Sequence, residues 1–259
     1  MPIITLTTDF GMADGYVATM KGVILSIAPA STLVDLSHQV PAQNVQTAAF
    51  LIYQAVPFFP SETIHLVVVD PGVGSQRRAL AVHTAQGIFV APDNGVLSYV
   101  LASADVREAV SLTKPAYQLP QVSATFHGRD IFAPAAAHLA NGVSLERLGP
   151  RAINLLRLPL SQPERRPNDD LVAHVMHVDH FGNLILDVTA DDVDEECVFE
   201  LGGRSIEGVS GTFADVADGE LVAYVGSSRD HVEIAVRNSD AAQELEIGIG
   251  DRVLIRRIL

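Results

Sequence analysis

Cysteine is nearly absent from this sequence, which holds one, Cys197, among 259 residues. A single thiol excludes an internal disulfide and argues against a thiolate metal cluster. Cationic residues are also few, because 17 Lys and Arg stand against 31 Asp and Glu and give a formal net charge of −14. Nucleic acids and anionic membranes are bound by clustered cations. The charge balance therefore argues against nucleic acid and against a membrane surface as partners.

Long hydrophobic runs are missing as well. No stretch approaches the roughly eighteen continuous apolar residues that span a bilayer, and residues 1–5 lack the basic and apolar parts of a secretory leader. Apolar residues nevertheless make up 48% of the chain, which is enough to bury a large core. We expect a globular, cytoplasmic protein.

The first half alternates short apolar runs with helical patterns. Residues 64–69 are almost all β-branched or leucine, which is typical of a strand buried on both faces. Strands that alternate with helices predict an α/β domain, a mostly parallel sheet with flanking helices. The predicted strands are 3–7, 33–36, 64–69, 80–83 and 88–91, and the predicted helices are 16–27, 45–56, 95–102 and 131–140.

Beyond about residue 152 the helical pattern fades. Pro159, Pro163 and Pro167 are typical of a linker, and short strands separated by glycines follow it. This pattern predicts an all-β, barrel-like C-terminal domain. Its predicted strands are 171–178, 184–188, 221–225, 232–236 and 252–258. We expect an α/β domain over 1–160, a linker over 161–169 and a β-barrel domain over 170–259.

Two aspartates follow predicted strands of the first half. Asp9 comes at the carboxyl end of the first strand, where ligands bind in open α/β sheets. Its carboxylate suits a ribose diol, a cation or a simple turn. Asp70 follows the most apolar strand, and the glycines after it permit close approach of a ligand to the backbone, although an ordinary turn fits the same pattern. Asp14 precedes the helix at 16–27 and is suited to capping it.

His127 lies in Phe-His-Gly-Arg-Asp, residues 126–130, just before a predicted helix. Polar and ionisable groups at a helix N-terminus favour a binding site, but a single histidine there is more often structural. His127 becomes a stronger candidate only if it meets Asp70 in space. The segment Pro-Asp-Asn-Gly, residues 92–95, fits either a turn with a cap or part of a site.

The second half offers three further segments. His177, Asp179 and His180 lie at a strand end, with spacing too loose to specify a metal. Phe213 can stack on a flat ring or fill the β core. Residues 227–229, Ser-Ser-Arg, form a polar turn before a strand.

Taken together and in this order, these segments resemble the S-adenosyl-L-methionine (SAM) hydroxide adenosyltransferase family, to which fluorinase and chlorinase are related. The resemblance runs from Ile4 to Ile258. It implies an N-terminal α/β domain and a C-terminal β-barrel. It also implies a homotrimer with the ligand between one subunit's N-terminal domain and a neighbour's C-terminal domain. Hydrolases of the family split SAM, their substrate, into adenosine and methionine without a cofactor or a metal. The segments that carry the resemblance are 7–11, 70–74, 92–95, 126–130 and 179–183.

The resemblance also assigns roles to residues. It implies that Asp70, Arg77 and His127 hold the attacking water, with Arg78 as the alternative to Arg77. The implied substrate-binding residues are Asp9 for the ribose, Asp179 for the methionine ammonium, Asn183 and Phe213 for the adenine, and Ser228 or Arg229 for the methionine carboxylate, with Asp14 and Phe126 beside them.

Three other functions stay open at this point. A halogenase is disfavoured, because the fluorinase places a tyrosine where Asp70 stands and carries an extra loop within the stretch that matches 79–94. A non-catalytic binder of adenosine or SAM would need Asp9, Asn183 and Phe213 but not Asp70. A metal-dependent hydrolase would draw on Asp9, Asp70, Asp93, His127 and His138.

Overall fold

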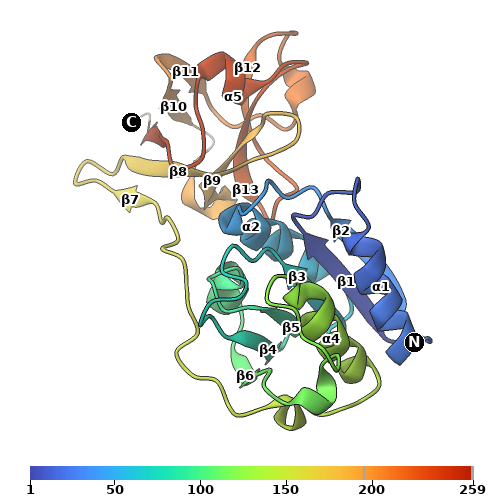
Figure 1. Ribbon diagram of the computed structural model, residues 1–259. Helices are drawn as coiled ribbons and strands as arrows, with labels where there is room; N and C mark the ends of the chain where they lie inside the picture. The colour runs from blue at the N-terminus through green and yellow to red at the C-terminus, as the bar shows by residue number, and fades with distance from the viewer. Residues whose placement is uncertain (195, 258–259) are drawn as a thin grey trace. The chain divides into compact units, whose positions relative to one another are not determined.

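The computed structural model describes residues 1–194 and 196–257 and is drawn in Figure 1. The chain divides into two compact units, Met1–Pro159 and Leu160–Leu259. The domain limits expected from the sequence, 1–160 and 170–259 with the linker 161–169, remain a prediction. Ile258, the last residue of the final predicted strand, lies outside the described residues.

The first unit is a six-stranded sheet with helices on both faces. The strand order is β2-β1-β3-β5-β4-β6, with parallel pairing from β2 to β5 and antiparallel pairing of β4 with β5 and β6. The α/β prediction is confirmed, and the sheet is mixed. The strands are β1 (Ile3–Thr8), β2 (Thr32–Ser37), β3 (Ile64–Val68), β4 (Ala79–Thr84), β5 (Gly87–Pro92) and β6 (Val106–Ser111), and the helices are α1 (Tyr16–Ile27), α2 (Val45–Ala55), α3 (Ser98–Ser103) and α4 (Ala133–Ala140).

Strand β3 lies at the centre of this unit and is buried throughout. Leu66 and Val68 belong to one apolar cluster, with residues of α1 and α4, whereas Val67 and Val69 belong to another, with residues of α2 and α3. Successive side chains of a strand point to opposite faces, so a strand between two helical layers is apolar at nearly every position. Figure 1 shows α1 and α4 side by side on one face.

Several predicted boundaries of the first unit were wrong. Helix α3 begins at Ser98 rather than at Gly95, because Asn94 Oδ1 accepts from Val96 N–H and holds the chain in a turn. The first two residues of the predicted helix 131–140 belong to a π-helical turn, Gly128–Phe132, and α4 begins at Ala133. The sequence pattern missed β6, since Arg107 and Glu108 interrupt its apolar residues as charged residues commonly do on edge strands.

The second unit is a nearly closed, mostly antiparallel sheet in the order β11-β10-β14-β8-β9-β13-β12, with β7 paired to β8. The barrel-like prediction is confirmed. Its apolar core includes Val175, Leu186, Phe199 and Ile234. The strands are β7 (Glu164–Arg165), β8 (Leu171–Val178), β9 (Leu184–Thr189), β10 (Cys197–Leu201), β11 (Arg204–Glu207), β12 (Leu221–Val225), β13 (His231–Val236) and β14 (Arg252–Arg257).

Some elements of this unit escaped the sequence pattern. The hairpin of β10 and β11 turns at the two adjacent glycines 202–203, which the pattern marked only as punctuation. Helix α5 (Ala241–Leu245) is one turn and a half long, too short to display helical periodicity. Among the described residues, no helix is both long and apolar enough to cross a membrane.

A buried histidine lies inside the first sheet. The side chain of His65 is wholly buried on β3, with Nδ1 2.9 Å from Thr5 Oγ1 and its ring stacked on Phe89 at 5.0 Å. Burial disfavours the imidazolium and lowers the pKa of His65 to about 4. In the unfolded chain the ring takes up a proton below about pH 6.5. Between these two values the unfolded chain holds more protons, so stability falls as the pH falls.

We predict that lowering the pH from 7.5 to 4.5 costs wild-type protein about 2 kcal/mol of unfolding free energy through His65, and that His65→Gln loses this component. Urea unfolding at both pH values measures it. The control is His180→Gln on an exposed turn, which should keep the wild-type pH dependence because it leaves the buried His65 ring in place. An unchanged pH dependence in His65→Gln would contradict the prediction.

Candidate active site

A cavity of about 390 Å³ opens in the first unit beyond the carboxyl ends of β1 and β3. Four residues singled out in the sequence meet there from three separate segments. This is the edge at which open α/β sheets bind ligands. The four residues are Asp9, Asp70, Phe126 and His127, and the other lining residues include Tyr16, Gln43 and Val73.

Asp70 and His127 contact the same guanidinium. Arg77 Nε donates to Asp70 Oδ1 and Oδ2 at 2.9 and 3.0 Å, and Arg77 Nη2 donates to Oδ2. Nη2 also lies 2.8 Å from His127 Nδ1. The Arg77 side chain is only 9% exposed, and its Cζ lies 5.2 Å from the ring centre of the buried Phe132. The three residues to which the resemblance assigns the water thus form one contiguous group.

This contact fixes the protonation of His127. A guanidinium carries only donors, so Nδ1 must accept and the ring proton lies on Nε2. Partial burial lowers the pKa of His127, and the Arg77 cation lowers it further against the opposing influence of Asp70 and Asp130. His127 is therefore neutral at neutral pH and presents Nε2–H as a donor.

The neighbouring arginine has a different partner. Arg78 Nε donates to Asp93 Oδ2 at 2.7 Å, and the two Nη groups donate to the carbonyl oxygens of Ile153 and Asn154. Asp93 Oδ1 accepts from Leu156 N–H at 2.9 Å. Arg77 thus contacts Asp70 and His127, two residues that line the cavity, whereas Arg78 and Asp93 hold the segment 153–156 in place.

Glycines allow the segments around the cavity to approach closely. Gly74 has a positive φ of 78°, and a Cβ there would lie 2.7 Å from the carbonyl oxygen of Ala124. Gly128, at the start of the π-helical turn, packs so tightly that a Cβ would lie 3.2 Å from both Met20 and Val68. These positions therefore favour glycine because of close packing at both and backbone conformation at Gly74.

Asp9 also lines the cavity. Its Oδ2 accepts from the backbone N–H of Gln43 at 2.8 Å. An aromatic group made of Phe10, Tyr16 and Phe126 stands beside it, with ring centres 5.3 to 5.8 Å apart. Sequence reasoning missed Tyr16, because its place in the helical pattern of α1 gave no sign of a cavity.

Asp14 is exposed and does not line this cavity. The expectation that it caps α1 was wrong, because the N-cap position is Gly15 and no side chain makes a cap hydrogen bond there. The helix starts one residue too late for a cap at Asp14.

The second unit has its own cavity, about 730 Å³, lined by Asp179, Asn183 and Phe213 among others. Asp179 organises the turn between β8 and β9: Oδ1 accepts from the N–H groups of Phe181 and Asn183, and Oδ2 accepts from the Asn183 amide. Gly182 has a positive φ of 82°, and a Cβ there would overlap Asp240.

Phe213 is half exposed, not part of the β core, and contacts the edge of Tyr224 with ring centres 5.7 Å apart. Tyr224 in turn donates to the buried Glu233 at 2.9 Å. Ser227 lines the cavity, whereas Ser228 and Arg229 do not, and Arg229 has a left-handed φ of 57°. The structure thus groups Asp179, Asn183 and Phe213 and leaves Ser228 and Arg229 just outside.

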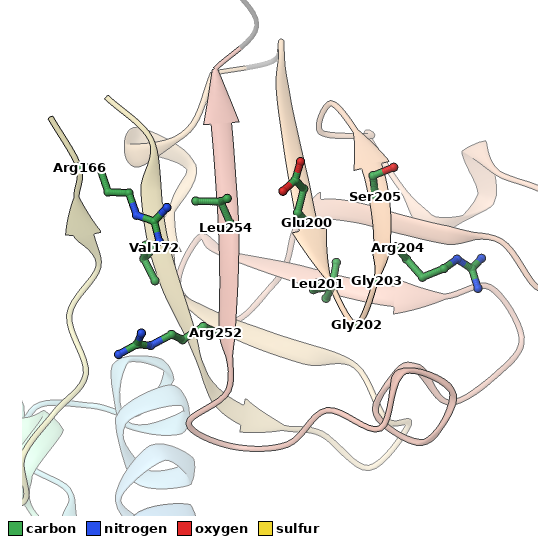
Figure 2. A pocket seen from close by; sticks show the side chains of 10 residues that line it. All are labelled: Arg166, Val172, Glu200, Leu201, Gly202, Gly203, Arg204, Ser205, Arg252 and Leu254. Atoms are coloured by element: carbon green, nitrogen blue, oxygen red, sulfur yellow. The ribbon is translucent and has the colours of Figure 1, made fainter. Parts of the chain in front are cut away.

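A third cavity of about 550 Å³ lies over strands β8, β10, β11 and β14. Figure 2 shows Glu200 and Ser205 on adjacent strands, with the turn 202–203 between them. Three arginines line it, but it holds none of the residues predicted from the sequence. In the described part of the chain, no three His, Cys, Asp or Glu side chains are grouped so as to hold a metal ion. The five ligands of the metal-hydrolase alternative are therefore not brought together.

Comparison with known proteins decides the family. The model of the SAM hydroxide adenosyltransferase N-terminal domain matches residues 4–149, and that of the C-terminal domain matches residues 173–254. The chain belongs to the SAM hydroxide adenosyltransferase family.

Individual relatives agree over nearly the whole chain. A protein named (R)-S-adenosyl-L-methionine hydrolase from Salinispora tropica is 43% identical over 98% of this chain and 97% of its own. A fluorinase from Nocardia brasiliensis is 30% identical over 98% and 97%. The crystal structure of an uncharacterized conserved protein from Thermotoga maritima superposes with a TM-score of 0.91 at 38% identity, covering 98% of this chain and 100% of that one.

We predict that Asp93→Ala lowers the free energy of unfolding by about 2 kcal/mol, because the Leu156 N–H and the Arg78 guanidinium lose a buried acceptor. Urea unfolding measures the change. The control is Asp218→Ala, which removes the exposed partner of Arg237 and is expected to cost less than about 1 kcal/mol. Equal losses in the two variants would show that the Arg78–Asp93 contact is no more than a surface ion pair.

Proposed function

We propose that this protein hydrolyses SAM to adenosine and methionine by attack of water on the ribose C5′ atom. The observation that carries the proposal is the contact of Asp70, Arg77 and His127 at the wall of a cavity that also holds Asp9. The 43% identity to a SAM hydrolase supports the same reaction. SAM is the substrate, and the scheme uses no cofactor and no metal.

The three residues would orient the water. Asp70 accepts one O–H of the water through lone pairs that Arg77 leaves available. His127 donates Nε2–H to the water oxygen and fixes one of its lone pairs. The other lone pair then points along the line opposite the sulfonium, which is the geometry of an in-line displacement.

Electrostatics favours the displacement in a cavity with little water. A new C5′–O bond forms as the C5′–S bond breaks, and the electron pair of that bond neutralises the sulfonium. The proton that the water loses passes to Asp70 and then to solvent, so each turnover releases adenosine, methionine and one proton. The electrostatic attraction between a negative charge and a cation is stronger where water is excluded, and the Asp70 side chain is only 5% exposed.

The remaining predicted residues would bind the substrate. Asp9 Oδ1 makes no hydrogen bond with the described residues and is available to a ribose hydroxyl, while Oδ2 accepts from Gln43 N–H. Phe126 contributes to the aromatic wall of that cavity. In the second unit, the exposed ring of Phe213 suits stacking on adenine and the Asn183 amide suits its edge. Asp179 suits the methionine ammonium, and the turn that holds Ser228 and Arg229 suits the carboxylate.

Five of the predicted binding residues lie in two different cavities, one in each unit. Asp9 and Phe126 line the first cavity, and the second is lined by Asp179, Asn183 and Phe213. We propose that a complete site combines the first cavity of one subunit with the second cavity of a neighbour in a homotrimer. A cytoplasmic location remains a prediction from the sequence.

Halide transfer is the second candidate function, because a relative 30% identical is named fluorinase. Asp70 disfavours it, since a carboxylate at the nucleophile site repels a halide ion but accepts a hydrogen bond from water.

We predict that the protein in plain buffer releases adenosine and methionine in equal amounts, and that ¹⁸O from labelled water enters the adenosine 5′-hydroxyl. Asp70→Ala and His127→Ala each lower kcat by roughly 10²–10⁴-fold, as expected for loss of a group that orients or deprotonates water. Chromatography and mass spectrometry of the products measure both effects.

The control is His138→Ala, since His138 packs its ring on Tyr117 away from the cavity and should leave turnover near the wild-type value. Unlabelled adenosine, loss of activity on adding a chelator, or a halogenated product when halide is supplied would overturn the proposed reaction. Thermal stabilisation by SAM without turnover would instead indicate a binding protein.

We predict that Asp70→Ala and Asp179→Ala, each nearly inactive alone, recover activity when their subunits are mixed under exchange conditions. If each site takes one cavity from each of two subunits, random mixing leaves about a quarter of the sites with both cavities intact. Initial rates before and after exchange measure the recovery. No recovery, with exchange verified by native mass spectrometry, would place the whole site within one subunit.

A further inference from the structure

A series of contacts connects the loop that carries Asp9 to the side chains of Thr8, His38 and Asp35. The backbone N–H of Phe10 donates to Thr8 Oγ1 at 3.3 Å, and Thr8 Oγ1 lies 2.9 Å from His38 Nδ1. On the other side of the ring, His38 Nε2 lies 2.9 Å from Asp35 Oδ1. Thr8 is wholly buried and His38 is 5% exposed, so water cannot replace these contacts freely.

The Thr8 hydroxyl joins the backbone to the imidazole. Its oxygen accepts from Phe10 N–H and lies within hydrogen-bond distance of His38 Nδ1, so it links the residue after Asp9 to the buried ring. The Asp35 carboxylate lies 2.9 Å from Nε2, on the other edge of that ring.

The outer end of the series reaches the surface of the first unit. Lys21 Nζ donates to Asp35 Oδ2 at 2.6 Å, while Asp35 Oδ1 faces His38. Partial burial tends to raise the pKa of Asp35, but its contacts with Lys21 and His38 outweigh this and lower it. The anion that orients His38 is therefore kept ionised by a cation on α1.

Backbone contacts join the same segment to Asp9. Gly11 N–H donates to the carbonyl oxygen of His38 at 2.8 Å, and Gln43 N–H donates to Asp9 Oδ2 at 2.8 Å. The loop that carries Asp9 is thus held by His38 on both sides, through Thr8 before it and through Gly11 after it. Loops hold a side chain within a narrow range only when their own groups are fixed in this way.

We propose that Thr8 and His38 are positioning residues that set the Asp9 carboxylate for the ribose diol of the substrate. The inference rests on the role of Asp9 in the proposed function. Neither Thr8 nor His38 lines the cavity, and both act through the loop 9–11. Their effect should therefore fall on recognition of the ribose hydroxyls rather than on the adenine or on the attacking water.

The test is calorimetric titration of the full chain with adenosine and with 2′,3′-dideoxyadenosine, since the ratio of the two dissociation constants reports the ribose contact alone. Wild-type protein should prefer adenosine, and Asp9→Asn should abolish the preference. Thr8→Val should lower the preference about tenfold, because Phe10 N–H and His38 Nδ1 both lose their partner. Thr8→Ser keeps the hydroxyl and should retain the preference.

The same strand supplies a matched control. Thr5 is also wholly buried on β1, and its Oγ1 also lies 2.9 Å from a histidine Nδ1, that of His65. Thr5→Val removes an equivalent contact in the middle of the strand and should leave the ratio unchanged. If Thr8→Val does not fold, Asp35→Asn at the exposed outer end should lower the preference about threefold.

The outcomes separate the inference from the proposed function. The ratio of the two dissociation constants can stay unchanged in Thr8→Val and Asp35→Asn while Asp9→Asn loses the preference for adenosine. That result overturns the inference and leaves the ribose role of Asp9 intact. An equal loss of the preference for adenosine in Thr5→Val also overturns the inference, because a general loosening of β1 then explains the effect. No preference in wild-type protein overturns the ribose role of Asp9 and the inference with it.

Discussion

The Arg77 guanidinium is the group on which the first cavity depends. It binds the Asp70 carboxylate through two nitrogens and presents a donor to His127 Nδ1, while its carbon lies over the Phe132 ring. A largely buried carboxylate and cation are tolerable only as a hydrogen-bonded pair. The same cation decides which nitrogen of His127 carries the proton, so one ion pair sets both the charge and the donor pattern of the cavity wall.

The two cavities present different kinds of contact to a ligand. In the first, Asp9 and Asp70 both line the cavity and accept from fixed donors, a backbone N–H and a guanidinium. In the second, Asp179 is largely consumed by the turn that it organises, and Phe213 offers an open ring face. A cationic sulfonium and a flat purine would need these two kinds of surface, which fits the assignment of substrate parts to the two units.

Some of the site could be predicted from the sequence, and some could not. The sequence singled out Asp9, Asp70 and His127, which line one cavity, because strand ends and short polar motifs are local features. Tyr16 was missed and Asp14 was misjudged, because the direction of a side chain at the start of a helix depends on where that helix begins, and the N-cap is Gly15. The series from Thr8 through His38 to Lys21 left no signal, since its members belong to three elements and follow no spacing rule.

The sequence by itself determined the two fold classes, the strands with apolar patterns and the motifs whose joint order resembles one family, because periodicity and motif order are properties of neighbours along the chain. Only the tertiary structure decided that Arg77 and not Arg78 meets Asp70 and His127. Adjacent residues in an extended segment point to opposite sides, and which side faces the cavity depends on packing of distant parts, with Arg78 drawn to Asp93 and the carbonyls of 153–154. Fifty residues separate Arg77 from His127, and only the fold brings them within 2.8 Å.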